Sequence, residues 1–283
     1  MNRIELLVGL LCLRLGPGLA AAEVPETQYL SNITQLTDQR MGLVNAGEAY
    51  FSPDAATIIF QATPKGKTDY QIYTMSLASR RPRMVSTGKG ACTCAFFRPD
   101  GRKIIFASSH LRPTGEPPKH VDDHGDYKWS FDEYMDIFEA DPDGSNLRRL
   151  TRTPGYDAEG AYSPDGRLIV FTSQRDGDLE LYLMDADGRN QRRLTHKKGY
   201  DGGPFFSPDQ KSILYRGDHR GDGEMNLQLR IISADGTTDR ALTDNPLFNW
   251  CPYWHPSGTC FIFTRADHRG RPNYDLFMTT PQG

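Results

Sequence analysis

Tyr162-Ser163-Pro164-Asp165-Gly166 is one of five copies of a motif in which an aromatic residue is followed, two positions later, by Pro-Asp or Pro-Ser. Proline presets φ near about −65°, aspartate can bond its own backbone, and glycine accepts a positive φ, so the motif predicts a tight turn. The copies begin at Phe51, Phe97, Tyr162, Phe206 and Trp254, at spacings of 46, 65, 44 and 48 residues. Such a period is typical of repeat proteins.

Each copy of the motif is followed by further strand-like runs. In the third copy, Leu168-Ile169-Val170-Phe171 has the composition of a second strand, and Glu180-Leu181-Tyr182-Leu183-Met184 that of a third. The repeat closes on a turn at Asp187-Gly188 and a Leu-Thr pair at 194–195, a spacing that two other copies share. Four strands in about 45 residues without helical periodicity predict an all-β fold, a β-propeller of four-stranded antiparallel blades. Five blades are recognisable, so we expect a ring of five or six.

The N-terminal part of the propeller carries a Leu-Thr pair of its own. Leu36-Thr37 precedes the first turn motif, and no such pair follows the last one. We therefore expect an N-terminal strand to close the last blade, which would leave the ring without an open edge.

Three segments can be separated along the chain. Residues 1–22 combine an early Arg3, an apolar run of about a dozen residues and small residues at 18–22, which predicts a cleaved secretory signal peptide. Residues 30–283 form the expected propeller, and the wide 65-residue spacing marks an insertion at about 107–135. We expect a periplasmic or secreted protein with no membrane span in the mature chain.

Charge and cysteine content narrow the function further. The net charge of −3 comes from 33 basic and 36 acidic residues spread along the chain, so nucleic acid is not an expected partner. Cys92, Cys94, Cys251 and Cys260 could pair in an oxidising compartment or remain as buried thiols, and the sequence leaves both alternatives open.

The aromatic-Ser-Pro-Asp-Gly turns, the Asp-Gly to Leu-Thr repeat ends and the stretch Thr172-Ser173-Gln174-Arg175-Asp176-Gly177 resemble the repeats of TolB-like β-propellers. They are more distantly similar to the propeller domains of dipeptidyl peptidase and prolyl oligopeptidase enzymes. The resemblance covers about residues 30–278. It implies six blades, usually with an additional α/β domain in TolB, whereas this chain shows five repeats and no such domain.

The residues just before each turn motif are expected to line the mouth of the central channel. Glu48, Cys94, Glu159, Gly203 and Cys251 lie three positions before the five aromatic residues, and the positions two residues further upstream include Cys92, Asp157, Asp201 and Asn249. Carboxylates at one level could bind a metal or a cationic ligand, or they could simply be solvated. The candidate ligand contacts are Glu48, Asp157, Glu159, Tyr156, Asp201, Tyr200 and Asn249.

The insertion supplies a second group of candidate contacts, namely Asp122, Asp123, His124 and Trp129. Long loops in compact domains are often functional, so we expect this one to cover one face of the ring.

The sequence contains no Gly-x-Ser-x-Gly elbow, His-Glu-x-x-His pair or phosphate-binding loop. The leading hypothesis is therefore a non-catalytic binding or protein-interaction scaffold in the cell envelope, which takes a protein, peptide or cell-wall ligand at the channel mouth. The alternative is a metal-dependent polysaccharide lyase or hydrolase that uses the channel, with carboxylates as ligands or bases. No cofactor is expected under the first hypothesis, and calcium or another divalent metal under the second.

Overall fold

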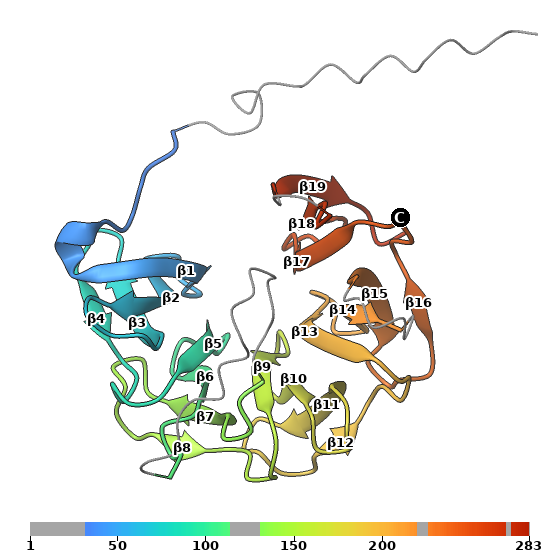
Figure 1. Ribbon diagram of the computed structural model, residues 1–283, viewed down its shortest axis with the longest axis horizontal. Helices are drawn as coiled ribbons and strands as arrows, with labels where there is room; N and C mark the ends of the chain where they lie inside the picture. The colour runs from blue at the N-terminus through green and yellow to red at the C-terminus, as the bar shows by residue number, and fades with distance from the viewer. Residues whose placement is uncertain (1–31, 114–130, 220–225, 270–272, 283) are drawn as a thin grey trace, which may run out of the picture. The chain divides into compact units, whose positions relative to one another are not determined.

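The computed structural model describes residues 32–113, 131–219, 226–269 and 273–282. The chain divides into two compact units, Met1–Leu36 and Thr37–Gly283. The described part of the first unit, residues 32–36, contains neither helix nor strand. In the second unit, the described residues form five antiparallel sheets around a central channel (Figure 1). The predicted all-β propeller is therefore confirmed, and of the five or six blades expected, the described residues form five.

A short 3-10 helix, η2 (Gln39–Met41), precedes the sheets. Blade 1 contains β1 (Leu43–Phe51), β2 (Thr57–Pro64), β3 (Gln71–Ser76) and β4 (Pro82–Met84). Blade 2 contains β5 (Cys92–Phe97), β6 (Ile104–Ser108), β7 (Asp136–Ala140) and β8 (Arg148–Arg149). Blade 3 contains β9 (Asp157–Tyr162), β10 (Leu168–Ser173), β11 (Glu180–Asp185) and β12 (Arg192–Arg193). Blade 4 contains β13 (Tyr200–Phe206), β14 (Ser212–Asp218), β15 (Gln228–Ser233) and β16 (Asp239–Ala241), and blade 5 contains β17 (Phe248–Trp254), β18 (Phe261–Ala266) and β19 (Asp275–Thr279).

The repeated motif forms the turn between the first two strands of each blade. In blade 3 the Ser163 hydroxyl donates to Asp165 at 2.6 Å and accepts the amide of Leu168 at 3.0 Å, while Gly166 has a φ of 70°. The serine and aspartate side chains therefore satisfy the backbone of the turn, as expected for this sequence.

The Leu-Thr pair fastens the outer edge of a blade to its third strand. The Leu194 amide donates to the carbonyl of Leu181 at 2.7 Å, and the Leu181 amide donates to the Thr195 hydroxyl at 2.9 Å. Equivalent pairs of bonds are made by Val85-Ser86, Leu150-Thr151 and Leu242-Thr243. The core lies between neighbouring blades, where, for example, Leu181 of blade 3 packs with Ile213 of blade 4.

The expected N-terminal closing strand is not formed. Residues 33–38 lie in no strand, and in the described part of the chain blade 5 has three strands, ordered β17-β18-β19. Leu276, the second residue of β19, is consequently 59% exposed, whereas its equivalents Ile72, Ile137, Leu181 and Leu229 are fully buried. In the other blades, the fourth strand follows the third after a short turn. Leu36-Thr37 and β19 are separated by almost the whole propeller sequence, so their pairing would have a larger entropic cost of loop closure.

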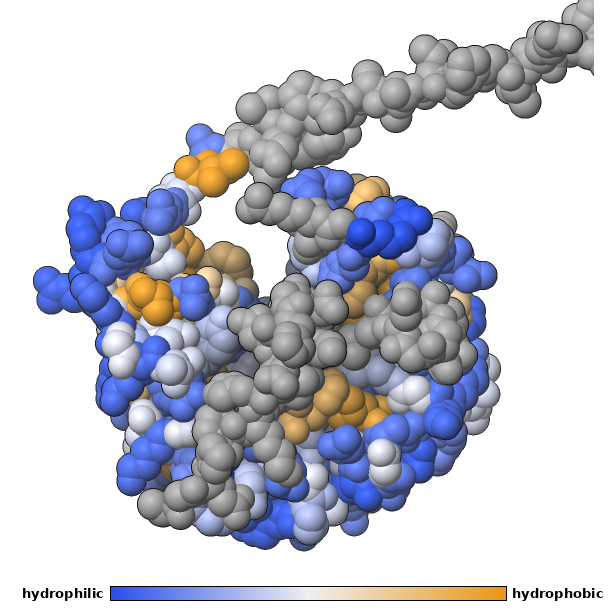
Figure 2. All heavy atoms as spheres, viewed as in Figure 1, coloured by the Kyte–Doolittle hydropathy of each residue, from blue (hydrophilic) through white to orange (hydrophobic). Residues whose placement is uncertain are grey.

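Blade 1 and blade 5 are therefore not joined by strand pairing among the described residues, and Figure 2 shows an opening between them. In the same part of the chain, no helix is long and apolar enough to cross a membrane.

Candidate functional site

The innermost strand of every blade contains a bulge at the same position. At each bulge the pairing with the second strand shifts register, and the bulged residue has a left-handed φ between 48° and 58°. The five bulged residues are Glu48, Cys94, Glu159, Gly203 and Cys251. Since a bulge redirects the side chain that it carries, these residues form one level of the channel wall.

A cavity of about 610 Å³ lies at this level of the channel, and all five bulged residues line it. Beside them stands an aromatic collar, which we define as Tyr50, Phe96, Phe205 and Tyr253. The rings contact one another, with centroids 4.0 Å apart for Tyr50 and Phe96 and 5.3 Å apart for Phe205 and Tyr253. Phe51 of blade 1 and Ile262 of blade 5 also line the cavity and are exposed, so the cavity extends toward the opening between these blades.

Glu159 is held by a dense set of donors. Its Oε1 lies 2.5 Å from the Arg216 guanidinium, and its Oε2 accepts bonds from the Gly203 amide at 2.7 Å and the Thr172 hydroxyl at 2.9 Å. The Arg216 guanidinium also donates to the Tyr200 hydroxyl at 3.1 Å and lies 4.3 Å from the ring centre of Trp250. The charge of Glu159 is therefore neutralised within the protein.

Glu48 is in a different state. It forms no ion pair with any described residue, although Arg216, which is bound to Glu159, lies near enough to favour its ionised form. The surrounding protein raises the pKa of the Glu48 carboxyl, and the charge of Glu159 adds to this rise. Among the described residues, the cavity thus presents an acidic group without an ion-pair partner, Glu48, beside the aromatic collar.

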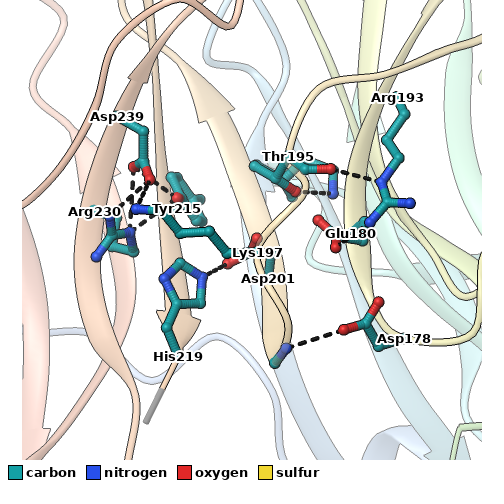
Figure 3. A network of polar contacts seen from close by, with 12 residues as sticks. Asp178, Glu180, Arg193, Thr195, Lys197, Asp201, Tyr215, His219, Arg230 and Asp239 are labelled. Atoms are coloured by element: carbon teal, nitrogen blue, oxygen red, sulfur yellow. Dashed lines mark hydrogen bonds and ion pairs between the residues drawn. The ribbon is translucent and has the colours of Figure 1, made fainter. Parts of the chain in front are cut away.

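The other channel candidates lie at the beginning of the innermost strands and are buried within or between blades. Asp157 is paired with Arg175 at 3.1 Å, Asp201 lies 2.7 Å from His219 (Figure 3), and Asn249 accepts a bond from Arg265 at 3.0 Å. Tyr156 is buried as well, and so is Tyr200, whose hydroxyl bonds with Arg216 and Glu159 of the cavity wall. The structure thus brings Glu48 and Glu159 to the cavity and gives the other five residues contacts behind it.

The insertion candidates Asp122, Asp123, His124 and Trp129 lie outside the described residues. Strand β6 ends at Ser108 and β7 begins at Asp136, so the additional chain lies between the second and third strands of blade 2.

Sequence reasoning missed Arg216 and the aromatic collar. A signal for the collar was present, because the residue immediately before the repeated aromatic is itself aromatic in four of the five copies, with Ala161 as the exception. No repeated position marks Arg216, since it belongs to β14 and acts across to blade 3.

The four cysteines Cys92, Cys94, Cys251 and Cys260 carry free thiols. Within the described ranges, no group of three or more His, Cys, Asp or Glu side chains is placed to hold a metal ion.

Cys251 offers a test of the cavity environment. Cys251 is exposed at the cavity wall, but the protein around it reduces the hydration of the thiol and raises its pKa to about 12. The charges of Glu48 and Glu159 contribute to this rise, while Arg216 opposes it. At neutral pH its thiolate fraction is therefore about 1,000-fold below that of an ordinary cysteine. We expect iodoacetamide, followed by peptide mass spectrometry, to label Cys251 slowly at neutral pH and progressively faster as the pH rises. Labelling as fast as in the unfolded chain would contradict this environment.

Comparison with known proteins identifies the family to which the chain belongs. Residues 127–275, just over half of the chain, match the family described as the Tricorn protease N-terminal β-propeller domain. The Tol-Pal system protein TolB of Bordetella pertussis is 56% identical over 39 residues, which cover 14% of this chain and 9% of that protein. The match therefore spans much less than two thirds of this relative.

Solved structures share the fold. The structure of a TolB homologue from Agrobacterium tumefaciens has a TM-score of 0.65 at 23% identity, covering 84% of this chain and 78% of that one. TolB from Acinetobacter baumannii has a TM-score of 0.59 at 23% identity, over 82% and 54% of the two chains. An oligogalacturonate lyase in complex with manganese has a TM-score of 0.55 at 16% identity, over 86% and 66%. At these identities the similarity concerns the fold.

Proposed function

Since the chain belongs to the family of the Tricorn protease N-terminal β-propeller domain and is a TolB-like propeller, we propose that it is a non-catalytic binding scaffold of the cell envelope. Residues 1–22 direct its export to the periplasm or the exterior. The channel cavity then takes a segment of a protein or peptide partner, and Asp122, Asp123, His124 and Trp129 of the insertion provide further contacts. The observation that carries this proposal is the 610 Å³ cavity, with its aromatic collar and with Glu48, which forms no ion pair with a described residue.

The chemistry of the cavity favours a partner segment with both apolar and positively charged groups. The aromatic collar offers ring faces for apolar contacts and for cations, which are attracted to aromatic rings. Glu48 has no ion-pair partner in the described part of the chain, whereas Glu159 is satisfied by Arg216. A lysine or arginine side chain of the partner would therefore pair with Glu48.

Partner capture tests the proposal. The immobilised full chain is incubated with envelope extract from the source organism, and bound proteins are identified by mass spectrometry. We expect Glu48→Lys to weaken binding of the captured partner at least about tenfold, or about 1.4 kcal/mol, because it reverses the charge that the partner pairs with.

Asp244→Lys is the matched control, since Asp244 is also acidic but exposed and outside the cavity. It should bind as the unmodified chain does. If Glu48→Lys and Asp244→Lys bind the partner equally well, the cavity is not the binding site. If no specific partner is captured, the protein is not a binding scaffold.

The alternative function, a metal-dependent lyase or hydrolase in the channel, requires a bound metal. No described group of side chains is placed for one, and the similarity to a manganese-bound lyase is one of fold. Elemental analysis of the purified chain decides between the two, because a stoichiometric divalent metal would favour the enzyme.

A further inference from the structure

The junctions between neighbouring blades share one construction. The first residue of a third strand meets a residue near the start of the innermost strand of the next blade, five positions before its repeated aromatic. At the junction of blades 4 and 5 these are two amides, Gln228 and Asn249. The Asn249 amide nitrogen donates to Gln228 Oε1 at 3.2 Å, and Asn249 Oδ1 accepts from Arg265 at 3.0 Å. An amide pair can make such a bond because each group has a donor and an acceptor.

The junction of blades 3 and 4 places two carboxyl groups in the same positions. Glu180 of β11 and Asp201 of β13 are both fully buried. The charge of Asp201 raises the pKa of Glu180, and the Thr195 side chain acts on the pKa of both carboxyls, so the two groups lie together (Figure 3). One oxygen of each is bound, Glu180 Oε1 by Arg193 and Asp201 Oδ1 by His219.

The second oxygens, Glu180 Oε2 and Asp201 Oδ2, are buried and have no hydrogen-bond partner among the described residues. Two ionised carboxylates cannot satisfy each other, since both are acceptors, whereas one protonated carboxyl donates as an amide does. We propose that Glu180 and Asp201 share one proton, and that the resulting carboxyl–carboxylate hydrogen bond between Oε2 and Oδ2 fastens blade 3 to blade 4 in acidic solution and is lost in alkaline solution. The proton comes from the solvent and returns to it.

The charged groups near Glu180 and Asp201 bind only their first oxygens or are bound elsewhere, so the hydrogen bond between the second oxygens requires the shared proton. Arg193 binds Glu180 from the outer edge of blade 3, and His219 binds Asp201 from the end of β14. Tyr215 and Asp239 also face Asp201, but Asp239 is occupied by Arg230 at 2.7 Å, Tyr215 at 2.8 Å and Lys197 at 3.0 Å. Asp178, below the pair in Figure 3, accepts the amide of Gly199 at 3.0 Å.

The direction of the pH dependence follows from burial. Burial raises the pKa of both carboxyls, and the Asp201 charge raises that of Glu180 further. The Thr195 side chain lowers both pKa values, and so do Arg193 at Glu180 and His219 at Asp201. A carboxyl with a raised folded-state pKa adds stability that is fully present below its unfolded pKa of about 4 and is lost as the pH rises through the folded value. The junction is therefore strongest in acid and weakened in neutral to alkaline solution.

This junction lies on a strand that also builds the channel wall. Strand β13 continues from Asp201 to Gly203, whose amide donates to Glu159 at 2.7 Å. The proposal is independent of any partner in the cavity, because it concerns only the fastening of two blades.

The decisive variant is Asp201→Asn in the full chain, which installs the amide found at the next junction. It can donate to Glu180 at any pH while its carbonyl still faces His219. The melting temperatures of the variant and the unmodified chain are compared at about pH 5 and about pH 8, which bracket much of the range of raised carboxyl pKa values. At the lower pH, the two melting temperatures should differ little. At the higher pH the melting temperature should rise by about 2–4 °C.

Asp157→Asn is the matched control at the junction of blades 2 and 3. This junction also holds two carboxyls, Asp136 and Asp157, but all four of their oxygens accept hydrogen bonds, those of Asp136 from Arg149 and Thr151. Arg175 reaches both oxygens of Asp157, at 3.1 and 3.2 Å, so the amide loses an ion pair and should lower the melting temperature at both pH values. The proposal is overturned if Asp201→Asn also lowers it at both. Should that variant not fold, Glu180→Gln and the infrared band of a protonated carboxyl in the unmodified chain decide, since absence of this band in acid, where the proton should be bound, would exclude a shared proton.

Discussion

Replacing Arg216 by methionine is expected to lower the free energy of unfolding by about 3–5 kcal/mol. The side chains of Arg216 and Glu159 are only 8% and 13% exposed, and the guanidinium binds Glu159 while it stacks on Trp250. Methionine keeps most of the apolar stem but leaves the Glu159 carboxylate without its cation in a nearly buried site. Urea denaturation of the full chain, followed by far-UV circular dichroism, measures the change.

A second substitution, at Glu159, tests whether Arg216 stabilises the protein through its ion pair or through its packing. Glu159→Gln retains acceptors for the Gly203 amide and the Thr172 hydroxyl but removes the charge. The double variant, Arg216→Met with Glu159→Gln, should therefore recover much of the lost stability. If the double variant is as unstable as Arg216→Met, packing on Trp250 rather than the ion pair supports this part of the channel wall.

Gly199→Ala is expected to destabilise the protein by about 2–6 kcal/mol, through backbone strain and steric overlap together. Gly199 has a φ of 129°, and a Cβ atom there would overlap the backbone carbonyl oxygen of Asp218. Because this neighbour is backbone, relief requires β14 to move away from β13. Chemical denaturation checks the loss, and a reduced yield of folded protein would accompany it.

The chain contains its own control for this substitution. Gly155 holds the equivalent position in the duplicated Gly-Tyr-Asp sequence and has a φ of 110°, but the nearest atom to its added Cβ would be 3.8 Å away. Gly155→Ala should therefore show the backbone strain alone, about 1–3 kcal/mol. Equal losses at the two glycines would mean that the contact with Asp218 has no effect.

Much of the fold could be predicted from short stretches of sequence. Ser163 and Asp165 satisfy their own turn, and the Leu-Thr pair at 194–195 binds the nearby strand β11, so these features need no distant partner. Their repetition was enough for the strand order and for five blades. The closing strand was the exception, because Leu36-Thr37 would have needed a partner at the far end of the propeller.

The candidate site could be predicted only in part. Aligning the repeats separated the bulge level, with Glu48 and Glu159, from the level two residues upstream, with Asp157, Asp201 and Asn249. The sequence did not show that the first level lines the cavity and that these three upstream residues are buried, because burial depends on the side chains that pack from the neighbouring blade.

What the sequence by itself determined were the turns, the strands and the number of repeats, since these depend on backbone preferences and hydrogen bonds between residues close along the chain. Only the tertiary structure decided which charges are neutralised. Arg216 meets Glu159 across 57 residues, and Glu180 meets Asp201 across a blade junction. Electrostatic and packing energies depend on distances in space, and in a propeller these distances are set when one blade packs against the next.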